Sequence, residues 1–206
     1  MRLVGHPRRR RRSRGQALVE FSLIIPVFLT VFFSIVEFSF LFTNYISVNY
    51  ASHDAAQLAA TYGNTQYADA AILQRIDNDI STPADPKKIV TVDIYWVDTT
   101  KKDASPVAGH ENIYTYDGGA HDFLLTDGST HISLPFKTTS IGYLDTDRCN
   151  YNLGTGCSAL HLTVDTIGVK ITYQYTWVTP FPQFVTGSGS GPTLSSVNIM
   201  RLEPIL

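Results

Sequence analysis

Apolar residues are concentrated in one long run near the N-terminus. Between Leu18 and Phe42 the chain has 25 residues, most of them Leu, Ile, Val or Phe. As an α-helix this run would be about 38 Å long, which is enough to cross a lipid bilayer. Two carboxylates interrupt it: Glu20 near its start and Glu37 near its end, where the membrane interface can hydrate a charge. We predict a transmembrane helix over residues 16–42, because the run is too long for a cleavable secretory signal.

Helical periodicity continues beyond this run and stops at Gly63, a residue type that commonly ends helices. The residues that recur at three- to four-residue spacing are Tyr45, Ile46, Tyr50, Ala51, Ala55, Leu58, Ala59 and Tyr62. We therefore expect one unbroken helix from Ala17 to Tyr62, apolar all round in its first half and amphipathic in its second. A second helix, capped by Thr65, is predicted from the apolar stripe of Ala68, Ile72, Ile76 and Ile80. Residues 43–86 thus form a helical segment outside the membrane.

The pattern changes to a period of two after Lys88, which is typical of half-buried strands. The predicted strands are Val90–Trp96, Leu162–Val178 and Leu194–Leu202, with shorter pieces at Asn112–Tyr116 and His131–Thr138. The shorter pieces belong to a polar, Gly-rich stretch, residues 99–160, which we interpret as an insertion in a β-rich domain of residues 87–206. Helices followed by strands predict an α+β fold, in which the long helix packs on a small antiparallel sheet.

Charge is distributed unevenly along the chain. Seven of the 16 basic residues precede Gln16, and five of them are consecutive, from Arg8 to Arg12. From residue 43 onward there are 9 Lys and Arg against 16 Asp and Glu, a net charge of −7. A basic arm can bind nucleic acid, but beside an apolar span the positive-inside rule is the stronger interpretation. We predict no nucleic-acid partner, a cytoplasmic leader at residues 1–15, and a single-pass protein of the cell (inner or plasma) membrane with an extracytoplasmic C-terminal domain.

The two cysteines, Cys149 and Cys157, flank a Gly- and Asn-rich loop in the part of the chain placed outside the cytoplasm. Disulfides persist in such compartments, so a Cys149–Cys157 bond is predicted, with two free buried thiols as the alternative. No metal site, cofactor or catalytic constellation is predicted. The six histidines lack ligand spacing, and Asp145-Thr146-Asp147 lacks the glycine and distal glutamate of an EF-hand calcium loop.

The start of the apolar run carries a motif, Gly15-Gln16-Ala17-Leu18-Val19-Glu20-Phe21. This order after a basic arm resembles the beginning of TadE-like proteins, the pseudopilins of tight-adherence (Flp-type) pilus systems, which are relatives of type IV pilins. The similarity extends to an Ala-rich segment, residues 51–60, in which the family usually has an arginine where Gln57 stands. It returns at residues 169–175 and at the closing residues 200–203.

The resemblance implies a pilin-like fold and a non-enzymatic role in pilus assembly or associated secretion. It implies cleavage between Gly15 and Gln16 by a prepilin peptidase, with Gln16 as the new N-terminus. Glu20 and Phe21 would then serve processing and assembly. In type IV pilins the buried carboxylate is thought to pair with the α-amino group of a neighbouring subunit, and a charge inside a membrane needs such a partner. The implied partners are the membrane, the prepilin peptidase, other pilins or pseudopilins, and inner-membrane platform proteins of the same system.

Two alternatives stay open. The chain could be a pilus-tip adhesin whose insertion at residues 99–160 binds a surface or a glycan. It could also be an unrelated single-pass protein with an extracytoplasmic enzyme or sensor domain. Leader cleavage is expected for the pseudopilin and the adhesin and not for the unrelated protein. Incorporation into a pilus and residence in the membrane as a helper both fit the pseudopilin hypothesis.

Overall fold

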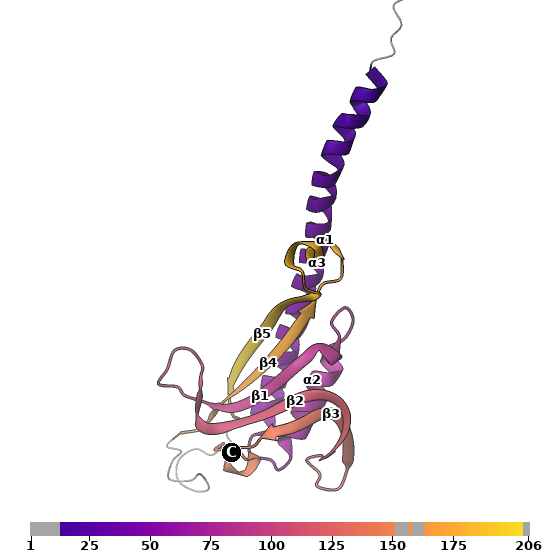
Figure 1. Cartoon of the computed structure of the whole chain (residues 1–206). Helices are drawn as coiled ribbons and strands as arrows, with labels where there is room; N and C mark the ends of the chain where they lie inside the picture. The colour runs from indigo at the N-terminus through magenta and orange to yellow at the C-terminus, as the bar shows by residue number, and fades with distance from the viewer. Residues whose placement is uncertain (1–12, 151–156, 158–162, 204–206) are drawn as a thin grey trace, which may run out of the picture.

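The computed structural model describes residues 13–150, 157 and 163–203. Its longest element is α1 (Ser13–Tyr62), a single helix of 50 residues with a length of about 75 Å. The N-terminal half of α1 projects away from the rest of the molecule, and the C-terminal half packs on it (Figure 1). The helix ends at Gly63, whose φ of 56° is a left-handed conformation that favours glycine. The prediction of one helix ending at Tyr62 is confirmed, and the helix starts four residues earlier than expected.

Five strands form one antiparallel sheet in the order β3-β2-β1-β4-β5. Their bounds are β1 (Ile89–Val97), β2 (Pro106–Leu124), β3 (His131–Ser140), β4 (Thr166–Thr176) and β5 (Ser190–Arg201). The remaining elements are helix α2 (Ala68–Asp79), the short helix α3 (Phe181–Thr186) and two 3-10 turns, η1 (Pro86–Lys88) and η2 (Asp145–Asp147). The short helix α3 was not predicted; it lies in the connection from β4 to β5. The predicted α+β fold, with a long apolar helix packed on an antiparallel sheet, is confirmed.

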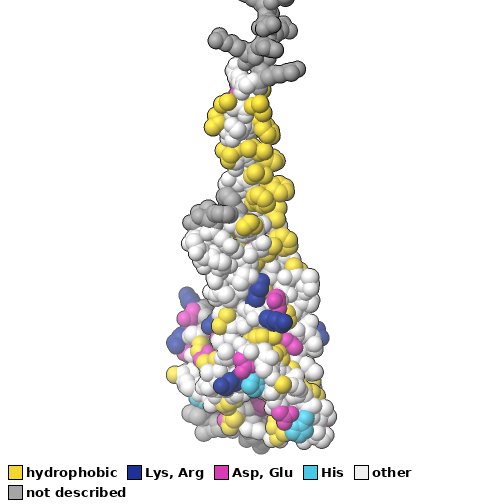
Figure 2. All heavy atoms as spheres, turned by 45° about the vertical axis from the view of Figure 1, so that its right-hand side comes forward, with side chains coloured by type: hydrophobic (Ala, Val, Ile, Leu, Met, Phe, Trp, Pro, Cys, Tyr) yellow, Lys and Arg dark blue, Asp and Glu magenta, His cyan; other side chains and the backbone are white. Residues whose placement is uncertain are grey.

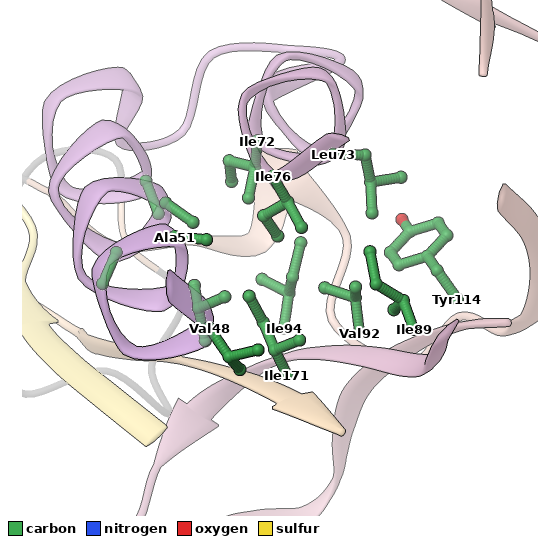
Figure 3. Packing of buried hydrophobic residues seen from close by; sticks show 14 of the residues in the cluster. Val48, Ala51, Ile72, Leu73, Ile76, Ile89, Val92, Ile94, Tyr114 and Ile171 are labelled. Carbon is green, nitrogen blue, oxygen red and sulfur yellow. The ribbon is translucent and has the colours of Figure 1, made fainter. Parts of the chain in front are cut away.

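The core lies between one face of the sheet and the two helices α1 and α2. Figure 3 shows the side chains of both helices pointing toward those of the strands. Alternate residues of β4 reach this core because side chains on a strand alternate between its faces. The residues of β4 that are fully buried in this way are Ile167, Val169, Ile171, Tyr173 and Tyr175, and the last four are those that the period-two pattern predicted on one side.

Helix α1 approaches the sheet through small side chains. The fully buried alanines of this helix are Ala51, Ala55, Ala56 and Ala59. The expectation that Tyr45, Ile46 and Tyr50 belong to the core-facing stripe is wrong, because their side chains are 43%, 37% and 68% exposed. Alanine lets two backbones approach closely, whereas a tyrosine would hold them apart, so the large residues lie on the outer face.

Helix α2 covers the rest of the same face of the sheet. Ile72 and Ile76 are fully buried, as predicted. Thr65 does not cap this helix: its hydroxyl donates to the Tyr62 carbonyl at 2.6 Å. The N-cap position belongs to Tyr67, which has a φ of 65° and makes no side-chain capping bond.

Residues 99–160 contribute two of the five strands. Strand β2 has 19 residues and β3 has 10, so both are longer than the pieces predicted there. Tyr114, Leu134 and Phe136 from these strands are buried in the common core. The interpretation of this segment as an insertion stays a prediction. In this fold, however, the segment is no separable appendage, and deleting it would remove β2 and β3.

Enlarging a buried alanine on α1 should loosen the helix from the sheet. We expect Ala55→Leu to lower the free energy of unfolding by about 1–3 kcal/mol, because the fully buried site has no room for extra methyl groups. Thermal unfolding of the full-length protein in detergent measures this. Gln57→Leu, on the exposed side of the same helix, is the matched control and should leave the midpoint nearly unchanged. Equal midpoints for the two variants would contradict close packing at Ala55.

Candidate functional site

The motif residues at the start of α1 lie far from the folded domain. Gly15, Gln16, Glu20 and Phe21 are all exposed on the first turns of the helix. The Gln16 Nε2 donates to Glu20 Oε1 at 3.0 Å, and this is the one hydrogen bond of Glu20 in the described part of the chain. The scissile bond expected after Gly15 lies within the first turn of α1, where the backbone N–H groups lack intrahelical partners. Opening that turn therefore breaks few hydrogen bonds.

Between the motif and the domain, α1 presents apolar side chains on all sides. The segment from Ala17 to Val36 has no buried residue and a length of about 30 Å, which matches the hydrocarbon thickness of a bilayer. Figure 2 shows hydrophobic side chains covering this part of the helix. By length and composition the helix can cross a membrane. Burial against the domain begins at the next residue, Glu37.

From Gly15 onward, Glu37 is the first buried residue of α1, with 4% of its surface exposed. Its Oε1 accepts hydrogen bonds from the Tyr175 hydroxyl at 2.7 Å and from the Val178 amide at 3.0 Å. Its Oε2 accepts from the amide and the hydroxyl of Thr179, at 2.9 and 2.7 Å. Both carboxylate oxygens are thus satisfied by donors from the end of β4 and the residues after it.

The prediction that the membrane interface hydrates Glu37 is wrong, since the protein itself supplies the hydrogen bonds. A charged group in an apolar run is costly unless it is paired or hydrogen-bonded, and this was the sequence signal available for Glu37. The four donors could not be recognised, because they lie about 140 positions along the chain. Burial, and then the bond to Glu37, raise the pKa of the Tyr175 hydroxyl, which therefore stays protonated and keeps donating.

Further polar residues attach α1 to the sheet along the same face. Asn44 Oδ1 accepts from the Tyr173 hydroxyl at 3.1 Å. About two turns later, Ser52 Oγ donates to the Val169 carbonyl at 3.0 Å. Glu37, Asn44 and Ser52 are seven and eight residues apart, close to two helical turns, so they share one face of α1. These bonds fix the rotation of the helix about its own axis.

A cavity of about 350 Å³ lies between α1 and the connection that carries α3. Besides Glu37 it is lined by Ser34, Phe38, Leu41, Trp177, Pro182 and Thr186. The lining is mainly apolar, and the cavity lies at the level where the exposed apolar segment of α1 ends. Its chemistry suits hydrocarbon better than a polar ligand.

A second group of buried charges lies at the other end of the domain. The guanidinium of Arg148 is fully buried and forms ion pairs with Asp69 and with Asp145, the latter at 3.0 Å. The other oxygen of Asp69, Oδ2, accepts from Asn112 Nδ2 and from the Tyr114 hydroxyl, both at 2.7 Å. A buried charge is tolerated when it is paired and hydrogen-bonded, so this network joins α2 and β2 to the loop that follows β3.

The same loop is tied to the start of β4 and closed by a disulfide. The Tyr143 hydroxyl donates to Asp165 Oδ2 at 2.7 Å, and the Cys149 amide donates to the same oxygen at 2.9 Å. The Tyr143 ring lies 5.1 Å from the Arg148 guanidinium carbon, in cation–π contact. The structure joins Cys149 to Cys157 with a Cα–Cα distance of 5.1 Å. The described part of the loop is therefore held on several sides.

Several carboxylates and histidines of the domain are engaged in ion pairs or close polar contacts. Asp145, considered above for calcium, is engaged by Arg148. His121 and His131 lie on the β2–β3 hairpin and contact the carboxylates of Asp117 and Asp122, at 2.9 and 2.7 Å. Within residues 13–150, 157 and 163–203, no group of three or more His, Cys, Asp or Glu side chains is placed to hold a metal ion.

Comparison with known proteins identifies the N-terminal segment. Residues 15–57 match the family model described as TadE-like protein. The resemblance to TadE-like proteins is thereby confirmed over a segment that begins at Gly15 and includes Glu20, Glu37 and Asn44. No match was found among curated proteins or solved structures.

Replacing the buried Glu37 by glutamine should release the connection after β4 from α1. The amide nitrogen of Gln would face hydrogen-bond donors in place of an acceptor, so the attachment should weaken by on the order of 2 kcal/mol. Hydrogen exchange of the Val178 and Thr179 amides should accelerate by about thirty-fold. Glu20→Gln is the matched control, because Glu20 lies outside the domain, and it should leave this exchange unchanged. Unaltered exchange in Glu37→Gln would show that the four bonds do not hold the connection.

The stability of the domain should depend on pH through Asp145. Burial, together with the negative charge of Asp69, raises the pKa of Asp145 from 3.8 to about 7, although Arg148 opposes this. Between those values the folded chain keeps a proton that the unfolded chain releases. The stabilising contribution is therefore complete below about pH 4 and is lost as the pH rises to about 7. The free energy of unfolding should fall over this range relative to Asp145→Asn. Parallel pH profiles for the two proteins would contradict the raised pKa.

Proposed function

We propose that this chain is a membrane-anchored pseudopilin that assists the assembly of a tight-adherence (Flp-type) pilus or an associated secretion process. The TadE-like match over residues 15–57 supports a role in such a pilus system. In this proposal the role is structural and non-enzymatic. The arginines from Arg8 to Arg12 keep the N-terminus in the cytoplasm. The disulfide at Cys149 is consistent with a domain on the opposite side of the membrane.

The observation that carries the proposal is the difference between the two glutamates of α1. Glu37 is satisfied by four hydrogen bonds from its own domain. Glu20, deeper in the apolar segment, has one hydrogen bond, from the Gln16 amide, within the described residues. A charged carboxylate inside a membrane span is costly without a partner, by up to about 3 kcal/mol at the bilayer centre. We infer that its partner belongs to another molecule.

Cleavage after Gly15 would create that partner chemistry. A prepilin peptidase would leave Gln16 with a free α-amino group, and the amino group of one subunit would pair with Glu20 of its neighbour. The exposed position of Gly15, Gln16 and Glu20 on the first turns of α1 is compatible with access by a peptidase and by a second helix.

The outer face of α1 supports packing against partner pilins and platform proteins. After the apolar segment from Ala17 to Val36, large side chains of α1 stay exposed on the side of the helix away from the core. They are Phe38, Phe42, Tyr45, Ile46 and Tyr50, which follow one another at mostly three- to four-residue spacing. Residues at this spacing share a helix face, and exposed aromatic residues are common in protein interfaces. This face would join neighbouring helices as the protein leaves the membrane for an assembly.

Processing and assembly are tested together by N-terminal peptide mass spectrometry of the protein from native membranes and from sheared surface material. We expect a mature chain that begins at Gln16, and we expect Gly15→Ala to retain the leader. Glu20→Ala should abolish pilus assembly while the domain keeps its unfolding midpoint, because Glu20 lies 17 positions before the first buried residue of α1.

Ser22→Ala is the matched control, since in the described part of the chain its hydroxyl bonds the Val19 carbonyl of the same helix, and it should assemble normally. A chain that begins at Met1, or normal pili in the Glu20→Ala strain, would overturn the proposal. Recovery of the mature protein from the sheared material would place it in the fibre, and its confinement to membranes would make it a helper.

A further inference from the structure

We propose that the connection from β4 to β5, residues 177–189, lies in the lipid–water interface of the membrane that α1 crosses, on the side of the domain. We call this segment the membrane-proximal tip. The phospholipid bilayer itself is then a binding partner of the folded domain, at a point separate from the helix. This inference rests on the membrane-spanning part of the proposed function and is independent of the role in a pilus.

The position of the tip supports this inference. Figure 1 shows α3, in this segment, beside α1 at the end of the domain from which the helix projects. The bonds from the Val178 and Thr179 amides to Glu37 hold the tip at one fixed height along α1. That height is the end of the segment from Ala17 to Val36, whose length of about 30 Å fills the hydrocarbon core. The tip therefore lies where the hydrocarbon ends.

The charge distribution agrees with this position. From residue 171 to residue 200 the sequence contains no Asp, Glu, Lys, Arg or His. The charged residues that bound this stretch, Lys170 and Arg201, lie at the middle of β4 and at the distal end of β5. Glu37 is the nearest carboxylate to the tip, and its charge is enclosed by four hydrogen bonds. An uncharged surface can enter the interface without the desolvation cost that charged side chains would impose.

The side chains of the tip suit an interfacial location. Val178 is 55% exposed, next to the polar backbone attachment to Glu37. The indole ring of Trp177 lines the apolar cavity beside α1, and its N–H is buried without a hydrogen-bond partner in the described part of the structure, so this ring adds apolar surface to the tip. The apolar cavity between Phe38, Trp177 and Pro182 adjoins the same place and offers a surface for the upper part of an acyl chain.

A second contact with the bilayer would restrict the motion of the domain. A single helix lets the domain swing about the point where the helix leaves the membrane. With the tip also immersed, the sheet would stand at a fixed angle to the bilayer, and the outer face of α1 with Phe42 and Tyr45 would keep a fixed orientation toward neighbouring molecules.

Site-specific fluorescence can test the depth of the tip. Val178→Cys and Val197→Cys each replace an exposed valine, 55% and 42% exposed. Val197 pairs with Lys170 on β4, so it lies roughly 25 Å from the tip along the strand. Each full-length variant would be labelled with nitrobenzoxadiazole without reductant, so that the Cys149–Cys157 bond stays intact. The labelled proteins would be reconstituted in phosphatidylcholine–phosphatidylglycerol vesicles that contain lipid with a nitroxide near the top of its acyl chain.

We expect the label at position 178 to lose emission in these vesicles and the label at position 197 to keep it. Val178 contacts Glu37 through its backbone amide, so its replacement by cysteine leaves the attachment in place. Equal resistance of the two labelled variants to protease checks that both domains are folded. Equal quenching of the two labels, or quenching at position 178 by a water-soluble nitroxide alone, would overturn the proposal. Release of the protein by alkaline extraction would instead show that the transmembrane assignment of α1 is wrong.

Discussion

The hydrogen bonds between Glu37 and the residues after β4 are the interaction on which the arrangement of the molecule depends. They lie at the point where α1 stops facing an apolar solvent and starts facing its own domain. Tyr175, Val178 and Thr179 each contribute at least one donor. All four donors must point at the two oxygens of one carboxylate, so the bonds form in one relative position of α1 and the connection after β4. It fixes the height of the domain along the helix, and Asn44 and Ser52 then fix the rotation.

The two halves of α1 satisfy opposite requirements with one continuous helix. The outer half has large apolar side chains on every side, as a helix surrounded by lipid requires. The inner half needs small side chains on one face, because Ala51, Ala55 and Ala59 let the helix lie close to β4 and β5. Hydrophobicity alone therefore does not mark the face that enters the core. Tyr45 and Tyr50 are more apolar in area than the alanines beside them, yet they lie outside.

Much of the fold could be predicted from sequence periodicity. The single helix ending at Gly63, the helix around Ile72 and the alternating residues of β4 all depend on local patterns, and the structure bears them out. Local patterns do not reveal which distant segments pair with one another. The full length of β2 and β3 depends on their mutual register and on β1. The bonds of Glu37 and the ion pair between Asp69 and Arg148 join residues far apart in sequence.

The same distinction separates the two glutamates of the apolar segment. A carboxylate in such a position must find donors or a positive charge, and the sequence alone does not say where. For Glu37 the fold supplies four donors within the chain, so this residue belongs to the architecture of the monomer. For Glu20 the described chain supplies the amide of Gln16 alone, and the folded domain is too distant to contribute. A group whose hydrogen bonds are supplied inside the molecule has no need of a partner, whereas in our proposal Glu20 obtains one from a second molecule. The helix thus carries one carboxylate that positions its own domain and one that, in our proposal, pairs with a neighbouring subunit.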